Sequence, residues 1–221
     1  MVALFVVLTF IFFIILDILI TKAQKQTHPA LSSVYNAPVF DRHSLVVPSE
    51  VFLSKGHTWA KVMRDGFVKV GIDGFIAKAL GRLFVTHMVP IGTRVKQGDV
   101  IMLAWVGRSN LQFRSPVDGV VESVNPELTG VGLKNGYSKQ WGVMIRPTNL
   151  MDNIRSLKYG QEMTDWMRTE FNRLKDFLGS HTPQVAMAGV TMQDGGTVME
   201  GAVSMINDEG VKDFQNEFLT M

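Results

Sequence analysis

The chain has 221 residues and a hydrophobic content of 46 %, enough for one domain with a real core plus appendages, which excludes a disordered protein. It has no cysteine, so disulfides, thiolate metal sites and iron–sulfur ligation are excluded. The formal net charge is +2, but residues 1–180 hold 21 Lys/Arg against 14 Asp/Glu, whereas residues 181–221 hold one Lys against six acids.

The N-terminal segment predicts a transmembrane anchor, residues 1–21. Val2 to Ile20 carry one charge in nineteen residues, and about 20 apolar residues cross a bilayer as a helix. No basic residue precedes the run and no small-residue cleavage site follows it, which favours a retained anchor over a signal peptide. Lys22 and Lys25 follow the helix, so we expect a single-pass membrane protein with its soluble domain in the cytoplasm.

Asp17 is the one charged residue inside this run. One interpretation is an interfacial acid near Lys22, and the other is a polar contact to a partner helix. A single helix offers no bundle in which to bury the acid, so a partner helix would belong to another chain. Asp17 is therefore a candidate partner-binding residue toward membrane-embedded protein subunits.

Residues 22–50 have linker composition, with three prolines and no apolar periodicity. The soluble domain is expected over residues 51–180. It opens with two alternating runs, 58–63 and 67–71, around an Asp-Gly turn, which is a strong hairpin signal. A short helix is expected over residues 75–80, before Gly81, and a strand over residues 83–89.

Two tight turns then frame a second hairpin. Gly98-Asp99 precedes one apolar strand, and residues 115–119 (SPVDG) precede another. Between them, residues 102–106 and 111–113 are expected to pair around a tip at residues 107–110. Short strands with frequent turns predict a mainly β fold, a small closed antiparallel sandwich or barrel.

Residues 151–159 and, more clearly, residues 161–178 have helical apolar spacing, and Gly179 is expected to end the second helix. Residues 181–221 form an acidic tail rich in Met and Gly. Its apolar content favours ordering on a partner or on the domain, and a frayed tail is the alternative.

The order of these elements resembles the lipoyl/biotinyl carrier fold, a barrel-sandwich hybrid, and in detail the H-protein of the glycine cleavage system. The similarity runs from about residue 51 to 178. The segments that carry it are residues 54–59 (SKGHTW), 70–75 (VGIDGF), 79–81 (ALG), 92–99 with its Gly-Asp turn, 115–119 (SPVDG), Asn125 and 141–145 (WGVMI).

The resemblance implies a lipoyl-lysine at the apex of the second hairpin, and this position falls on Arg108. The acidic residue that often precedes that lysine by three falls on Trp105. Lipoylation requires an amine that forms an amide, which a guanidinium does not supply, so we expect no cofactor on this chain. Lys96, Lys134 and Lys139 lie elsewhere than the apex.

Arg108 is then either an exposed tip residue without a role or a protein-docking contact. The docking hypothesis rests on its neighbours Trp105 and Phe113, because Arg and aromatic residues are enriched at interface hot spots. Strand alternation predicts that Trp105 packs inward, which weakens that hypothesis. Arg108 and Trp105 are the candidate partner-binding residues of the soluble domain.

The sequence contains no nucleophile–base pair, phosphate-binding glycine loop or close carboxylate pair, so we expect no enzyme. Its five histidines are scattered, and we expect neither a metal site nor a nucleic-acid partner. The leading hypothesis is a non-catalytic, membrane-anchored H-protein-like subunit that docks or assembles a larger membrane complex. The alternatives are a lipoyl carrier in glycine cleavage and, less favoured, a periplasmic export adaptor.

Overall fold

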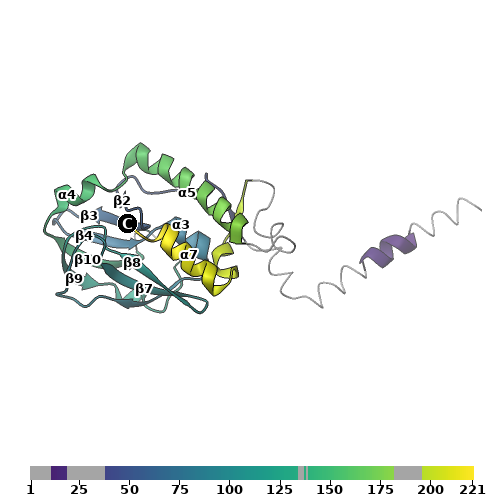
Figure 1. Ribbon diagram of the computed structural model, residues 1–221, viewed down its shortest axis with the longest axis horizontal. Helices are drawn as coiled ribbons and strands as arrows, with labels where there is room; N and C mark the ends of the chain where they lie inside the picture. Colours follow the sequence, from purple (N-terminus) through teal and green to yellow (C-terminus); the bar gives the residue numbers. More distant parts are fainter. Residues whose placement is uncertain (1–10, 19–37, 134–136, 138, 182–195) are drawn as a thin grey trace, which may run out of the picture. The chain divides into compact units, whose positions relative to one another are not determined.

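The computed structural model describes residues 11–18, 38–133, 137, 139–181 and 196–221 (Figure 1). It divides into two units, Met1–Pro38 and Val39–Met221. In the first unit, residues 11–18 form a helix that includes Asp17. Within the described ranges, no helix combines the length and the apolar character needed to cross a membrane. Most of the predicted anchor, and the linker up to residue 37, lie outside the described residues, so the anchor stays a prediction.

The described residues of the second unit form two larger antiparallel sheets, with strand orders β2-β3-β4-β10-β9-β6 and β5-β7-β8, and a two-stranded sheet given below. This confirms the predicted mainly β fold with short flanking helices. The strands of the larger sheet are β2 (Phe52–Leu53), β3 (Thr58–Val62), β4 (Val68–Ile72), β6 (Arg94–Val95), β9 (Gly119–Val124) and β10 (Trp141–Pro147). Those of the smaller sheet are β5 (Phe84–Met88), β7 (Val100–Val106) and β8 (Ser109–Arg114).

The β3–β4 hairpin forms where the sequence predicts it. Gly66 takes a φ of 85°, which a turn of this kind requires. Trp59 on β3 is buried and donates its indole N–H to the Ile72 carbonyl oxygen, 3.1 Å away. A Cβ at Gly71 would lie 2.6 Å from the Trp59 ring, so a side chain at position 71 would displace the indole. The absence of a side chain at Gly71 therefore makes room for the buried Trp59 ring.

The two predicted turns that frame the second hairpin are hydrogen-bonded to each other. The Gly98 amide donates to the Ser115 carbonyl at 2.9 Å, and the Ser115 amide donates to the Asp99 carbonyl at 2.7 Å. Asp118 fixes the same region from the side: it accepts from the Gln97 amide at 2.6 Å and from the Asn153 side chain at 3.1 Å. These contacts give the β7–β8 hairpin a rigid base.

The described residues of the part that resembles the H-protein include four helical elements around the sheets: α3 (Gly74–Leu80), η1 (Pro126–Leu128), α4 (Leu150–Arg155) and α5 (Gly160–His181). Asp73 caps α3 by accepting from the Ile76 amide at 2.9 Å. The predicted end of α5 at Gly179 is wrong, because the helix continues to His181. Its last turn is held by packing, since the His181 ring stacks on Phe177 at a centroid distance of 4.1 Å.

The described part of the tail folds onto this unit. β11 (Val198–Met199) pairs with β1 (Val39–Phe40), a strand that lies within the predicted linker. It is followed by η2 (Ala202–Met205), which packs on α3, and by α7 (Asp208–Phe218), which packs on β8 and on the end of α5 (Figure 1). Phe214 and Phe218 are buried against Phe177 at centroid distances of 5.7 and 5.6 Å. The apolar residues of the tail thus complete the core of the same chain.

Candidate functional site

The β7–β8 hairpin carries the two candidate residues of the soluble domain. Val106 and Ser109 are its last paired residues, so Gly107 and Arg108 form a two-residue turn, tighter than the predicted tip at 107–110. Gly107 has a φ of 57°, as expected for a glycine in the first central position of a hairpin turn. Arg108 is exposed at the apex.

The chemistry of the apex does not fit a lipoyl group. Such a group is attached through an amide to a lysine amine, and the turn between Val106 and Ser109 offers only the Arg108 guanidinium. The apex presents a fixed positive charge on a rigid hairpin, which suits recognition of an anionic group rather than covalent transfer.

Trp105 points outward, contrary to the prediction that it packs inward. A β-bulge between Val100 and Met102 is the reason. Ile101 and Met102 are both buried, so the alternation shifts by one residue and Trp105 comes to the outer face. Its side chain is 47 % exposed. Phe113, the other predicted aromatic neighbour of Arg108, is fully buried and takes no part in a surface.

The α7 helix lies along the free edge of β8. The Gln112 amide on β8 donates to the Gln215 side-chain oxygen on α7 at 2.9 Å, so a backbone group of the edge strand is paired by a helix side chain. A cleft of about 430 Å³ remains between the helix and the hairpin tip. Its lining residues are Arg108, Ser109, Asn110, Leu111, Asp208, Val211, Lys212 and Gln215.

A second group of charged residues, His57, Asp73, Glu170 and Arg173, is here called the His57 cluster. His57 is fully buried, with Nδ1 2.7 Å from Asp73 Oδ2 and Nε2 3.5 Å from Glu170 Oε2. The second distance permits an ion pair but is too long for a good hydrogen bond. Arg173 donates to both Glu170 oxygens at 2.6 and 2.8 Å.

The His57 cluster is set up to hold a buried positive charge. Burial by itself lowers the pKa of His57, but the charge and hydrogen bond of Asp73, with a smaller contribution from Glu170, outweigh it and raise the pKa to about 9. Burial likewise raises the pKa of Glu170, but His57 and Arg173 outweigh it, and the net direction is downward. The ring also stacks on Phe75 and packs on Trp166, at centroid distances of 4.9 and 5.0 Å. With no access to solvent, this histidine holds β3, α3 and α5 together and is not placed to meet a substrate.

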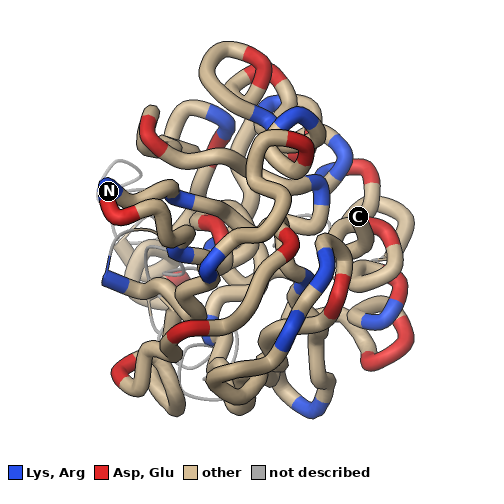
Figure 2. The backbone as a smooth tube through the Cα atoms, turned by 90° about the vertical axis from the view of Figure 1, so that its left-hand side faces the viewer, with Lys and Arg blue, Asp and Glu red and all other residues tan. Residues whose placement is uncertain are grey.

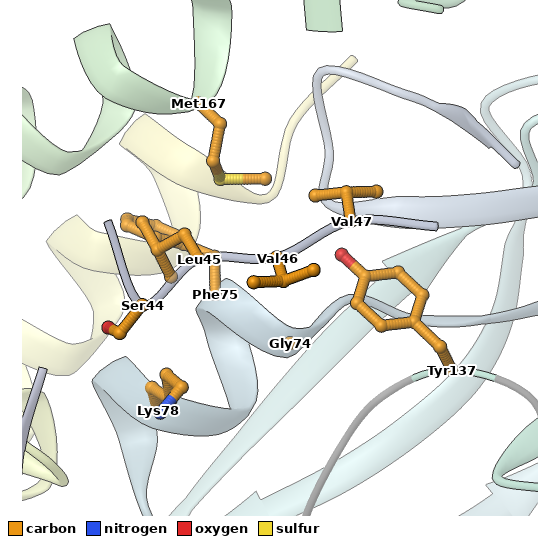
Figure 3. Close-up of a pocket in the computed structure, with 9 residues that line it drawn as sticks. All are labelled: Ser44, Leu45, Val46, Val47, Gly74, Phe75, Lys78, Tyr137 and Met167. Carbon is orange, nitrogen blue, oxygen red and sulfur yellow. The ribbon is translucent and has the colours of Figure 1, made fainter. Parts of the chain in front are cut away.

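A small cavity of about 80 Å³ lies between residues 44–47 and α3 (Figure 3). Apart from Leu45, Val46 and Val47, its walls include Phe75, Met167 and the Tyr137 ring, whose hydroxyl points toward Val47. Burial raises the pKa of the Tyr137 hydroxyl, so it stays protonated. Within the described ranges no group of three or more His, Asp or Glu side chains, the His57 cluster included, has an arrangement that could hold a metal ion. The cavity offers no nucleophile–base pair, and the hairpin remains the better candidate site.

Comparison with known proteins identifies the fold family. A family model described as "Glycine cleavage H-protein" matches residues 51–170, more than half of the chain. The chain belongs to the glycine cleavage H-protein family. The match begins at the same residue as the predicted domain and spans both sheets and the hairpin.

Individual H-proteins are similar over the same part of the chain. The probable glycine cleavage system H protein of Pyrococcus horikoshii is 30 % identical over 125 residues, covering 56 % of this chain and 93 % of that protein. The one from Thermococcus gammatolerans is 32 % identical over 117 residues, covering 50 % of this chain and 84 % of that protein. A crystal structure of the H protein from Mycobacterium marinum aligns with 46 % of this chain and 87 % of that chain at 23 % identity, with a TM-score of 0.41.

The structure brings two of the three predicted site residues together. Arg108 and Trp105 share the β7–β8 hairpin, whereas Asp17 belongs to the other unit. Sequence reasoning missed Phe84, which pairs with Trp105 across β5 and β7 and is 38 % exposed. Phe84 lies in the predicted strand over residues 83–89, and the sequence did not indicate which face of the sheet its side chain would occupy.

Proposed function

We propose that this chain is a protein-docking member of the H-protein family, which presents its β7–β8 hairpin to a partner protein without a lipoyl group at the apex. The observation that carries the proposal is Arg108, exposed on a two-residue turn where the family resemblance implies a lysine. Trp105 on the same hairpin is 47 % exposed, and Arg and Trp are the residue types most enriched at interface hot spots. In this role the chain binds and positions partners and catalyses no reaction.

A lipoyl carrier in glycine cleavage is the second candidate, and the comparisons favour it over docking. The matching family and the relatives described above are named as glycine cleavage H proteins. As a carrier, the chain would interact with other proteins of that system. Because residue 108 is an arginine, the lipoyl group would have to be attached to a lysine elsewhere in the chain. Lys96, exposed just before the Gly98 turn, lies at the base of the same hairpin.

Intact-mass spectrometry of the full chain, expressed with a lipoyl ligase and supplied lipoate, separates the two functions. Docking predicts the unmodified mass, because no amine stands at the apex. A lipoyl increment on any lysine would instead support the carrier. As a second readout, the purified chain is added to a glycine decarboxylation assay that lacks its H protein. Docking predicts no restored activity, and restored activity would overturn it.

We further propose that an anchor at residues 1–21 holds the domain on the cytoplasmic side of a membrane, close to membrane-embedded partners. The apolar run and the two lysines after it support this proposal. Carbonate extraction tests membrane attachment, and protease access in spheroplasts tests the side. Digestion in spheroplasts would favour the export adaptor, although such adaptors insert a long helical hairpin where this chain has a two-residue turn.

A further inference from the structure

The outer face of the three-stranded sheet carries an aromatic row. Phe84 on β5 is the register partner of Trp105 on β7, and Trp105 is in turn the partner of Asn110 on β8. A bridge to Gly132 extends the row on the other side of Phe84, next to Val131, which is 50 % exposed. The row therefore crosses the whole sheet. The Cβ atoms of residues opposite each other in antiparallel strands lie about 5 Å apart, so Phe84 and Trp105 present neighbouring exposed side chains on this face.

Two exposed arginines lie on one side of this row, at one end of the sheet. β5 and β7 are antiparallel, so the residues before Phe84 run toward the same end of the sheet as the residues after Trp105. Arg82 therefore lies on the apex side of the row, as Arg108 does, and both side chains are exposed. The two cations are 26 residues apart in sequence, and only the strand register shows that they share one end of the sheet.

Neither arginine is neutralised within the described part of the chain. The ion pairs found there involve other cations, including Lys61, Lys78 and Arg173. Asp208 lines the cleft beside Arg108 but makes no ion pair with it. Two unpaired guanidinium groups next to exposed aromatic rings complement a carboxylate beside an apolar side chain.

We propose that Arg82, Phe84, Trp105 and Arg108, here called the apex surface, bind an acidic protein segment that places an apolar side chain on the two rings. This inference rests on the proposed docking function and names the surface and the chemistry of the partner. The aromatic rings supply the buried contact at the centre, and the arginines fix orientation through charge-assisted hydrogen bonds.

A protein segment fits this surface better than a nucleic acid. Nucleic-acid surfaces gather many Lys and Arg along one face or groove. Here positive and negative residues are interspersed along the described backbone (Figure 2). Near the apex, α7 adds Asp208 and Glu209 in its first turn. A surface with only two arginines, and with the acids of α7 near one of them, can pair with a few carboxylates but would not follow a phosphate backbone.

Site-specific photo-crosslinking in the full chain tests the inference. Benzoylphenylalanine replaces Trp105, and in a separate variant it replaces Met151 on α4, which is 69 % exposed and serves as the control position. After irradiation of native membranes, the cross-linked peptides are sequenced by mass spectrometry. We expect position 105 to yield a peptide rich in Asp and Glu with an aliphatic or aromatic residue, and position 151 to yield no such peptide.

Charge reversal then tests the arginines. In the position-105 variant, Arg82→Glu with Arg108→Glu should lower the cross-link yield about tenfold, because like charges would face each other. Arg94→Glu with Arg155→Glu makes the same change in net charge at two exposed arginines outside the apex surface and should leave the yield within about twofold. All these side chains are exposed, and circular dichroism should show the same folded spectrum for each variant.

The possible failures are distinct. If partners are recovered but the cross-links come equally from position 151, or survive the reversal at Arg82 and Arg108, the apex surface is wrong and docking stands. If the partner at position 105 is removed by nuclease, a nucleic acid binds there and the inference is overturned. If neither position captures a partner in repeated trials, the docking function itself falls.

Discussion

The His57 cluster and the apex of the β7–β8 hairpin both present cationic side chains, in opposite environments. His57 is fully buried between two carboxylates, whereas Arg108 stands exposed on a turn without an ion pair in the described chain. A buried charge with complete partners holds the fold together, because removing either partner leaves the other uncompensated. An exposed charge without a partner adds little to stability and is available for binding. The contrast predicts that substitutions at the two places separate stability from function.

The largest expected effect is that of His57→Leu. The variant leaves Asp73 and Glu170 as buried carboxylates with fewer partners, and we expect the free energy of unfolding to fall by about 3–5 kcal/mol. Urea denaturation followed by circular dichroism measures it. Arg108→Ala is the matched control and should change the free energy of unfolding by less than about 0.5 kcal/mol. Equal losses at the two positions would break the contrast between them.

A smaller effect is expected from pH. The pKa of His57 is about 9 in the folded chain and close to 6.5 when unfolded, so between these values the folded state binds the extra proton. Its contribution is complete below about pH 6.5 and is lost as pH rises to about 9, for a total of about 3 kcal/mol. Urea denaturation at pH 6 and pH 9.5 measures the difference. In His57→Gln, the free energy of unfolding should change much less with pH in this window. If it changes as much as in the parent chain, other titrating groups cause the pH dependence.

Next in size is Gly71→Ala on β4. The new methyl group would lie 2.6 Å from the Trp59 ring, and we expect a loss of about 1–3 kcal/mol as the indole is displaced. Thermal melting monitored by Trp fluorescence reports both the loss and the movement of the ring. Gly132→Ala is the control, because its nearest neighbour would be 3.8 Å away, and it should shift stability by less than about 0.5 kcal/mol. A fully stable Gly71→Ala protein would show that the core tolerates a side chain there.

Much of the fold could be predicted because short sequence motifs at the turns determine where the turns form. The Asp65-Gly66 and Gly98-Asp99 turns fix where strands begin, and both hairpins lie where these pairs indicate. The orientation of Trp105 could not be predicted, because it depends on a bulge at Ile101 that no turn residue announces. A single extra residue in one strand exchanges the inner and outer faces of everything after it.

Long-range contacts account for the rest of what was missed. β1 pairs with β11 across about 160 residues, and neither two-residue strand has a periodicity to read. The end of α5 depends on α7, whose phenylalanines pack on Phe177 and favour helix beyond Gly179. The two carboxylates of the His57 cluster come from positions 73 and 170, so its charges could be brought together only by the tertiary fold. Arg82 and Arg108 share one end of the sheet for the same reason.

The smallest change in stability, less than about 0.5 kcal/mol, is expected for Arg108→Lys, because the side chain is exposed on the turn. Its chemical effect is the opposite: the variant restores the amine that an amide to lipoate requires, and coexpression with a lipoyl ligase should add one lipoyl group to its mass. Ser109→Lys is the matched control and should stay unmodified, because its amine is one residue from the apex. If Arg108→Lys also stays unmodified, the hairpin has lost more than its lysine. Trp105→Glu added to Arg108→Lys would then test whether the missing acid three residues earlier is what the ligase lacks.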